Sequence, residues 1–315
     1  MIEEDDVINS FEANYDEEEA MSLLGSNLAK TIYPLRVGHH MRLVNRNVNV
    51  EVGEDTAFAH VENTFEGMLY IAASFEKLRP TDTDVVDTII AKPFTTVITH
   101  NVIFARRYEW GFNFFGEHYG SGDGHSGERE PVTGNDGNGM NQGGNVSPGG
   151  NTNMYRKAWQ IVAVSLAEGG TGSPNIVITK LTITLPDGEE IVVESPNDYY
   201  LTRMAGRSDQ IPTFFSSESI LAKIELQSTY SDTDFVCITF GAGRDVRYNR
   251  AKQCMELVSE EFNGEYYTRT FQAEWVSRPN RGPKHAIINA VPKQVIFDDE
   301  TEVESNSWGI PYIVK

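Results

Sequence analysis

The sequence predicts a mostly β protein with an α+β first domain, and three features of the chain support this. Alternating apolar and polar residues recur along most of the chain, as in VNVEV, VITHNVIF and KLTIT. This period of two is typical of half-buried strands. β-Branched and aromatic residues dominate the same runs, which favours strands over helices. The length of 315 residues exceeds the usual size of a single core, so we expect two domains.

The composition excludes some classes of function. The net charge is −20, and a large part of it comes from acidic residues within positions 1–19. An acidic surface repels phosphate backbones, so nucleic-acid binding is not expected. No apolar run reaches the roughly 18–20 residues of a membrane-spanning helix. Positions 1–20 also lack the basic and then apolar pattern of a signal peptide. We expect no membrane span, and either an exported protein whose leader is absent from this chain or a cytoplasmic one.

The first domain is expected over residues 20–169, after an acidic tail at 1–19. The apolar spacing between Asp16 and Leu28 predicts an amphipathic helix, with Asp16 as its N-cap. The runs LVNRNVNVEV and TAFAHVENTFEGMLYIAAS, separated by a GED turn, predict two adjacent strands. AKPFTTVITHNVIFARRYEW and MYRKAWQIVAVSL predict two more.

A glycine-rich segment at 111–153 separates the last two of these strands. It contains GSGDGHSG, GNDGNGMNQGGN and SPGG and has almost no apolar residue to bury. The flanking patterns predict neighbouring strands of one sheet, joined by a loop far longer than a hairpin requires. Loops longer than about 12–15 residues are typically functional or disordered.

The second domain is expected over residues 170–315. NIVITKLTITLPDGEEIVVES predicts a hairpin with its turn at PDG. The runs SILAKIELQS, DFVCITFGAG, KQCMELVSE, EYYTRTFQAEWV, KHAIINAV and KQVIF predict further short strands. Short strands at near-regular spacing favour an antiparallel sandwich. GAGRDV lacks the glycine spacing of a phosphate-binding loop, so we expect it to be a hairpin turn.

The order of a helix, VNVEVGEDTAFAHVENTFEG, KPFTTVITHNVIFARR and KAWQIVAVS resembles the nuclear-transport-factor-2-like (SnoaL-like) cone fold. Residues 170–315 resemble an immunoglobulin-like sandwich in architecture. Together the two parts resemble exported bacterial lipoproteins. The cone resemblance implies that strand residues facing the interior could carry an acid–base pair.

His60 and His100 are the catalytic candidates that follow from this resemblance, with Glu62 or Tyr70 as a partner. Each histidine lies among apolar neighbours in a strand, and a histidine beside a carboxylate or phenol can transfer protons. The alternative is a structural histidine whose ring is hydrogen-bonded in the core.

Three other groups of residues are candidates for binding or crosslinking. One member of each adjacent aromatic pair in a strand points away from the core and could stack on a sugar or contact a protein; edge packing and an interface between the domains are the alternatives. These aromatic candidates are Phe112, Phe114, Phe115, Tyr199, Tyr200, Tyr266, Tyr267 and Trp308. Weak calcium candidates are Asp123, Asp136, Asp298 and Asp299, with a solvated acidic surface as the alternative. No other cofactor is expected. Cys237 and Cys254 lie in successive predicted strands and could form a disulfide in an oxidising compartment or stay as thiols.

The sequence therefore favours a non-catalytic exported protein, either a binding module or a structural part of a cell envelope or extracellular assembly. Its expected partner is a protein, a polysaccharide or a second copy of the chain. One alternative is an enzyme with isomerase-type or hydrolase-type acid–base chemistry at His60 and His100. The other is a subunit of a self-assembling filament or ring.

Overall fold

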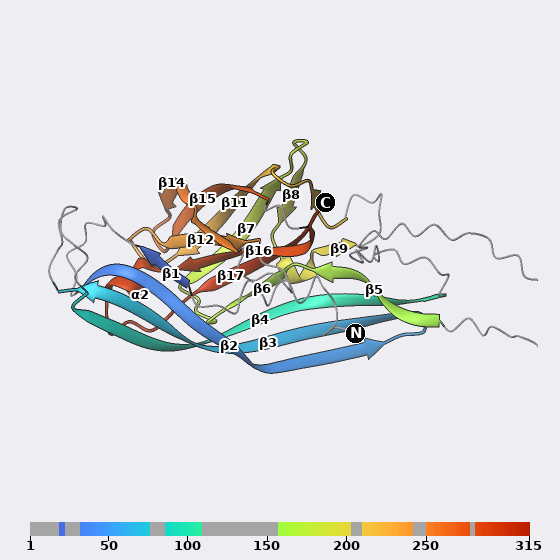
Figure 1. Ribbon diagram of the computed structural model, residues 1–315, viewed down its shortest axis with the longest axis horizontal. Helices are drawn as coiled ribbons and strands as arrows, with labels where there is room; N and C mark the ends of the chain where they lie inside the picture. Colours follow the sequence, from blue (N-terminus) through green and yellow to red (C-terminus); the bar gives the residue numbers. More distant parts are fainter. Residues whose placement is uncertain are drawn as a thin grey trace, which may run out of the picture. The chain divides into compact units, whose positions relative to one another are not determined.

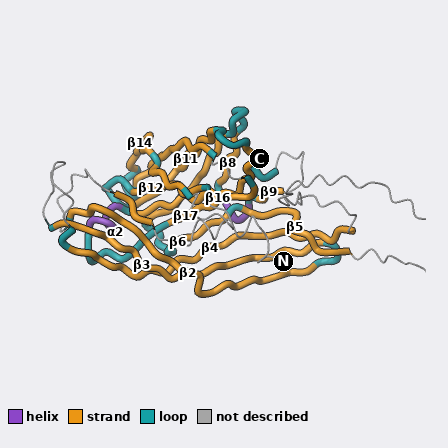
Figure 2. The backbone as a smooth tube through the Cα atoms, in the orientation of Figure 1, coloured by secondary structure: helices purple, strands orange, loops and turns teal. Residues whose placement is uncertain are grey.

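The structure, a computed structural model, describes residues 19–22, 32–75, 86–108, 157–202, 210–241, 250–277 and 281–315. The chain divides into one unit of Met1–Ala105 with Ile161–Lys315 and a second unit of Arg106–Gln160. Strands predominate among the described residues, as Figure 2 shows in orange, and this confirms the expected mostly β class.

A curled, mostly antiparallel sheet of twelve strands forms the larger part of the first unit (Figure 1). Its main strand order is β1-β2-β3-β4-β6-β17-β16-β12-β13. β5 pairs with β4 and β9, and β10 pairs in parallel with β17. The strands are β1 (Glu19–Ser22), β2 (Tyr33–Val52), β3 (Thr56–Ser74), β4 (Thr88–Tyr108), β5 (Lys157–Ser165), β6 (Ala167–Gly170), β9 (Tyr200–Thr202), β10 (Thr213–Phe214), β12 (Phe235–Phe240), β13 (Ala251–Cys254), β16 (Gly282–Val291) and β17 (Asn306–Val314).

A second sheet has five antiparallel strands in the order β14-β15-β11-β7-β8. They are β7 (Ile176–Thr184), β8 (Glu190–Val193), β11 (Ser219–Ser228), β14 (Glu256–Phe262) and β15 (Tyr267–Val276). The predicted PDG hairpin is confirmed, because β7 and β8 pair from Thr184↔Glu190 to Leu181↔Val193. Gly188 adopts the positive φ of +88° that this turn requires.

The GED turn is also confirmed, since it joins β2 to β3 in an antiparallel pair. Gly53 N–H donates to the Thr56 carbonyl at 2.8 Å and closes the turn. Along β3, buried and less buried side chains alternate over most of the strand, so that Ala57, Ala59 and Val61 face inward. This alternation is what the sequence pattern predicts for a sheet with one buried face.

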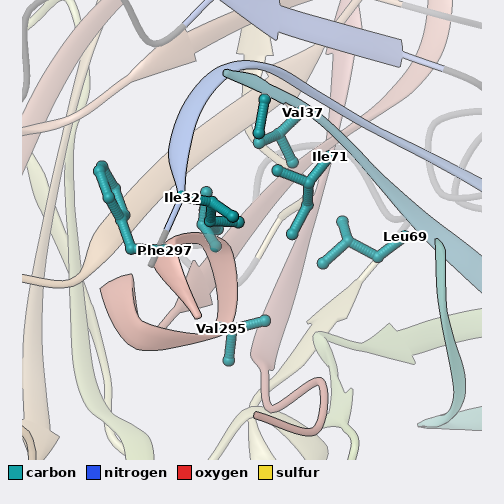
Figure 3. Packing of buried hydrophobic residues seen from close by; sticks show 8 residues of the cluster. Ile32, Val37, Leu69, Ile71, Val295 and Phe297 are labelled. Carbon is teal, nitrogen blue, oxygen red and sulfur yellow. The ribbon is translucent and has the colours of Figure 1, made fainter. Parts of the chain in front are cut away.

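A short helix, α2 (Lys293–Phe297), packs inside the curl of the first sheet. Its Val295, Ile296 and Phe297 are fully or almost fully buried against β2 and β3. Figure 3 shows Val295 and Phe297 beside Ile32, Val37, Leu69 and Ile71. KQVIF was expected to be a strand, and that prediction is wrong. A five-residue apolar run cannot be assigned to helix or strand by periodicity alone, and here the run is helical, with apolar side chains from β2 and β3 around it.

The ammonium group of Lys92 on β4 fixes the chain that follows α2. Lys92 is 6% exposed, and its Nζ donates to the carbonyl oxygens of Val295 and Thr301, each at 2.8 Å, and of Asp298. Burial lowers the Lys92 pKa, while the nearby Asp298 opposes this effect. A cation at the end of a helix satisfies carbonyls that have no partner within it.

The strands β12, β16 and β17 are buried on both faces, which explains their nearly continuous apolar sequences. On one face, Phe240 and Tyr312 each pack against Trp275 of the second sheet, with ring centroids 6.0 and 6.4 Å apart. On the other face, Phe235 stacks on Phe297 of α2 at 6.2 Å.

The expected α+β character of the first part is wrong. Residues 19–22, placed in a helix by their spacing, form β1 and pair with β2 from Glu19↔His39 to Ser22↔Arg36. Pairing with the next strand overrides a local helical pattern, because the helix preference is worth only tenths of a kcal/mol per residue. The helices of the described residues are α2 and the 3-10 turn η1 (Pro196–Asp198). The acidic residues 1–18 and positions 23–28 of the expected helix lie outside the described residues.

Strands from before and after residue 170 hydrogen-bond in the same curled sheet, through β6 and β17. The division into domains near residue 170 therefore stays a prediction about folding units, and no break in the sheet coincides with it. β4 and β5 are paired, as expected for the two strands that flank the glycine-rich segment. That segment, 111–153, lies outside the described residues.

Candidate functional site

The outer edge of β2 is paired over only part of its length. β1 covers residues Arg36–His39, and β3 occupies the other side of the strand. From His40 to Val52, no strand of the described part of the chain pairs with the outer edge, and Figure 1 shows β2 as the outermost of the long strands. A strand edge of this kind presents rows of N–H and C=O groups that can pair with another chain.

Residues 45–52, which we name the β2 edge, have the sequence NRNVNVEV. Val48, Val50 and Val52 share one face and are 37, 47 and 67% exposed. Asn47 and Asn49 are exposed on the other face. Two register shifts of β2 against β3 occur before the β2 edge, between Pro34 and Arg36 and between Leu43 and Asn45. Charged side chains, proline and bulges are the usual protections of a free edge. The β2 edge contains no lysine, proline or bulge, and its charged residues are Arg46 and Glu51.

The turn at Gly53 determines which backbone groups of the β2 edge point outward. Gly53 N–H donates to the Thr56 carbonyl, and in an antiparallel pair every second residue is hydrogen-bonded in this way. Glu51 and Asn49 are therefore hydrogen-bonded to β3. The N–H and C=O groups of Val48 and Val50 therefore point toward the open side.

The catalytic candidates lie on two different faces of the sheet. His60 is exposed, and its Nδ1 lies 2.8 Å from the side-chain oxygen of Asn101, to which it can donate a hydrogen bond. His100 is only 5% exposed, on the buried face. In the register of β3 and β4, His60 is opposite Asn101 and His100 is opposite Val61. Because successive side chains of a strand point to opposite faces, the two histidine side chains project in opposite directions. Glu62 and Tyr70 share the face of His60, and the structure does not bring the four residues into one site.

The aromatic candidates that the structure describes are buried or half-buried. Trp308, expected at the surface, is buried at 3% exposure. Tyr199, Tyr200, Tyr266 and Tyr267 are all half-buried. Tyr267 packs on Phe262 with ring centroids 4.6 Å apart. The remaining candidates at 112, 114 and 115 lie outside the described residues.

Cys237 and Cys254 are directly opposite each other on β12 and β13, both as thiols. Met255 N–H donates to the Val236 carbonyl at 2.8 Å, which makes the cysteine pair a non-hydrogen-bonded pair of the ladder. Such pairs have Cα atoms about 4.5 Å apart, a separation within the range of disulfides. The structure therefore gives the two thiols a geometry compatible with a crosslink.

The calcium candidates that the structure describes are occupied by local backbone contacts or exposed. Asp298 Oδ1 accepts from the N–H groups of Glu300 at 2.8 Å and Thr301 at 3.3 Å, and these bonds lower the Asp298 pKa. Asp299 is exposed, and Asp123 and Asp136 lie outside the described residues. Within the described ranges, no group of three or more His, Cys, Asp or Glu side chains is arranged to hold a metal ion.

A cavity of about 90 Å³ lies within the curl of the first sheet, and we name it the curl cavity. Its polar wall comes from β2, β12, β13, β16 and the segment before β17, and its apolar wall from β2, β3, β4, β12, β16, α2 and the chain after α2. The polar lining residues are His39, Cys237, Thr239, Lys252, Asn289 and Ser305. The apolar ones are Val37, Met41, Leu69, Phe94, Phe235, Ile287, Val291, Ile296 and Val303.

His39 is neutral within this cavity. Burial lowers its pKa to about 3, and the positive charges of Lys252 and Arg250 lower it further, in that order of importance. Its ring nitrogens make no hydrogen bond to the described residues. A neutral imidazole has one donor and one acceptor nitrogen.

Arg269 forms a buried ion cluster with a structural role in the second sheet. The side chain is 0% exposed and donates from Nη1 to Asp234 and from Nε to Glu260, each at 2.6 Å. Nη2 donates to the Ser231 carbonyl at 3.1 Å. Burial raises the Asp234 pKa to about 6, although Arg269 opposes the shift.

Glu304 joins the two sheets in a similar way. Its carboxylate accepts hydrogen bonds from Ser173 Oγ at 2.8 Å, Tyr230 Oη at 3.0 Å and Asn175 Nδ2 at 3.1 Å. Burial, followed by the adjacent carboxylate, raises the Tyr230 pKa to about 12. All three donors belong to turns at the ends of strands, so the Glu304 carboxylate holds these turns to the segment before β17.

Apart from Cys237, the polar residues of the curl cavity are not among the candidates that the sequence suggests. Thr239 and Asn289 each interrupt an otherwise apolar strand, in FVCITF and AIINAV. A polar residue at a strand position that alternation places inside is a signal that could have identified them. Their proximity to His39 and Lys252 could not be predicted, because it depends on the curl of the sheet.

The sequence matches no protein-family model and no curated protein. Among the residues that the structure describes, none of the helices has the length and apolar character to cross a membrane.

Proposed function

We propose that this protein is a non-catalytic structural or assembly protein that self-associates through the β2 edge. The observation that supports this proposal is the exposed run of residues 45–52, with outward backbone groups at Val48 and Val50. A free edge of this kind favours addition of another strand, and main-chain hydrogen bonds supply affinity in that mode of binding. The partner that we propose is the same edge of a second copy.

The side chains of the β2 edge are compatible with antiparallel pairing about a two-fold axis at Asn49. Such a pairing places Val48 opposite Val50, so that valines meet on one face. Asn47 meets Glu51 on the other face, where an amide can donate to a carboxylate. Arg46 and Glu51 are the charged residues of the edge, and this register places neither opposite a copy of itself. A closed two-fold contact of this kind produces a dimer.

The net charge of −20 opposes association of two copies at low ionic strength. Salt screens this repulsion, because the Debye length falls from about 30 Å at 0.01 M to about 8 Å at 0.15 M. Association through the β2 edge is therefore expected to strengthen as salt increases. Association driven by opposite charges would weaken under the same conditions.

Sedimentation velocity of the full chain at several salt concentrations tests this function. Val50→Pro removes an outward N–H without removing a hydrogen bond between β2 and β3, since edge positions tolerate proline. Val50→Thr is the matched control, because it keeps both the N–H and the preference for strand. We expect a dimer for the wild type and Val50→Thr and a monomer for Val50→Pro. A monomeric wild type, or a dimer that persists in a folded Val50→Pro variant, would refute the proposal.

The setting that we propose is the cell envelope or the extracellular space. The disulfide-compatible geometry of Cys237 and Cys254 supports an oxidising compartment. The cone-like interpretation of the first part and the immunoglobulin-like interpretation of 170–315 belong to this proposal and rest on the resemblance in strand order. Alkylation mass spectrometry of the protein purified from its native cells tests the setting, since a fully reduced pair would contradict it.

A further inference from the structure

Three buried side chains between the two sheets carry polar groups without a hydrogen-bond partner, and we name them the donor cluster. Lys284 lies on β16, Tyr312 on β17 and Trp275 on β15, and they are 4, 1 and 1% exposed. The Trp275 Nε1 and the Tyr312 Oη are buried and make no hydrogen bond to the described part of the chain. Lys284 forms no hydrogen bond or ion pair with another described residue. Buried polar groups nearly always have a partner, so three without one require an explanation.

The strand register and the ring contacts bring the donor cluster together. Lys284 is directly opposite Tyr312 in the antiparallel pair of β16 and β17, so both side chains project from the same face. The Cβ atoms of directly opposite residues are about 4.5–5.5 Å apart. The Tyr312 ring meets the Trp275 ring edge to face, with centroids 6.4 Å apart. The first sheet therefore supplies the amine and the phenol, and the second sheet supplies the indole.

The unpartnered groups of the donor cluster are all hydrogen-bond donors. An indole N–H donates only, and an ammonium group has three donors and no acceptor. Burial raises the pKa of Tyr312, so the phenol keeps its proton at neutral pH. The backbone N–H of Gly241 opposes this rise, and it too is a donor. The group that the donor cluster lacks is therefore an acceptor.

Burial also makes the Lys284 amine more reactive. It lowers the pKa of Lys284, because the ammonium form loses its hydration. A larger share of the side chain is then the neutral amine, which is a nucleophile. Since the side chain is almost fully enclosed, only a small reagent can reach it.

We propose that Lys284 is a site of carbamate formation with carbon dioxide. The lone pair of Nζ attacks the carbon of carbon dioxide, an N–C bond forms, and one C=O bond becomes a C–O⁻ bond. The proton that leaves Nζ passes to the solvent, so the step needs no oxidant or reductant. The carbamate oxygens accept hydrogen bonds from the Tyr312 O–H and the Trp275 N–H. This modification is independent of the association through the β2 edge.

The carbamate supplies the acceptors that the donor cluster lacks. The ammonium form of Lys284 adds donors to a set of donors, whereas the carbamate places two acceptor oxygens among them. Hydrogen bonds to an ionised acceptor are roughly twice as strong as neutral ones, which offsets part of the cost of burying the charge. An aldehyde would give an imine, whose single acceptor nitrogen leaves Tyr312 or Trp275 unsatisfied. The chemistry therefore favours carbon dioxide over other small carbonyl compounds.

Carbon-13 NMR of the full chain in carbon-13-labelled bicarbonate, which supplies dissolved carbon dioxide, tests the proposal. We expect a carbamate signal that saturates as bicarbonate increases and is lost in Lys284→Met. Lys223→Met on β11 is the matched control, because Lys223 is exposed and its removal should leave the signal unchanged. The chain-terminal amine also forms a carbamate, and the spectrum of Lys284→Met subtracts its contribution. A wild-type spectrum identical to that of Lys284→Met would overturn the proposal.

A second variant and a stability measurement place the carbamate in the donor cluster. Tyr312→Phe keeps the ring but removes one donor, and it should weaken carbamate formation about tenfold or more, since hydrogen bonds to charged groups are strong. Tyr70→Phe, at a position 41% exposed, should have no effect. Bicarbonate should raise the urea midpoint of the wild type above that in sodium chloride of equal ionic strength, and should not do so for Lys284→Met. A full signal in Tyr312→Phe without this stabilisation would place the carbamate elsewhere and overturn the assignment.

Discussion

Replacing Arg269 by methionine is expected to destabilise the protein through the carboxylate that the substitution leaves behind. Arg269 and Asp234 both have fully buried side chains and meet at 2.6 Å. Methionine occupies a similar volume but cannot donate, so Asp234 remains buried without its cation. Breaking a buried pair from one side costs about 3–5 kcal/mol. The second ion pair of Arg269, with Glu260, adds little to this cost, because the side chain of Glu260 is 37% exposed and exposed pairs contribute about 0–1 kcal/mol.

Urea unfolding of the full chain measures this difference, followed by circular dichroism. We expect Arg269→Met to lower the free energy of unfolding by about 3–5 kcal/mol with an unchanged m-value. Arg42→Met is the matched control. Its pair with Glu66 is 3.5 Å long and largely exposed, so removing it should cost less than about 1 kcal/mol. The double variant Arg269→Met with Asp234→Asn should lose less free energy of unfolding than the two single variants together, by about 1–3 kcal/mol.

The same substitution should change the pH dependence of stability. The Asp234 pKa is raised to about 6 in the folded protein, so this group contributes stability below its unfolded pKa that is lost as pH rises through about 6. Arg269 opposes the rise of the Asp234 pKa, so this pKa should be higher in Arg269→Met. The loss of stability with rising pH should then extend to higher pH. A cost below about 1 kcal/mol for Arg269→Met, or no coupling with Asp234→Asn, would refute the role that we assign to the buried pair.

Three further outcomes are expected. Lys92→Met leaves three carbonyl groups without their donor and should lower the free energy of unfolding in urea by about 2–4 kcal/mol. The control Lys180→Met removes one half-exposed ion pair with Glu225 and should cost less than about 1 kcal/mol. Equal costs would contradict the anchoring role of Lys92. The His39 pKa is 6.5 in the unfolded chain and is lowered to about 3 in the folded protein. His39 therefore contributes stability at pH values above 6.5, and this contribution is lost as the pH falls toward about 3. His39→Gln should therefore flatten the decline of stability between pH 6.5 and 4, and an unchanged decline would show that His39 is not buried as a neutral ring. Hydrogen peroxide should oxidise the Cys237 and Cys254 thiols to one disulfide, with reduction of the peroxide to water and a mass loss of about 2 Da; stability should rise by about 3 kcal/mol. Separate sulfenic or sulfinic acids without a crosslink would contradict the register.

Local chemistry was sufficient to predict most strands and two of the hairpins. The alternation in β3 follows from the two faces of a strand, and the GED and PDG turns follow from residues that favour tight turns. Pairing of β4 with β5 was also predictable, because apolar patterns of the same period flank the glycine-rich segment.

The helical assignments failed because the deciding contacts are made with strands outside each short segment. β1 has the apolar spacing of a helix, but the edge of β2 supplies hydrogen-bond partners to its backbone. α2 has the composition of a strand, yet it fills the space enclosed by β2 and β3. A pattern of a few residues contains no information about a neighbour outside it, which lies 14 to 20 positions away for β1 and more than two hundred for α2.

The same distinction applies to the sites. The sequence was enough to establish a β-rich acidic chain with Cys237 and Cys254 in successive strands, since those properties depend on composition and short-range periodicity. Only the tertiary structure separated His60 from His100 onto opposite faces and left the β2 edge without a partner strand among the described residues. Only the curl of the sheet brought His39 near Lys252, from strands more than two hundred residues apart. Register and curvature decide these contacts, because both arise from the summed packing of the whole sheet and from no single segment of the chain.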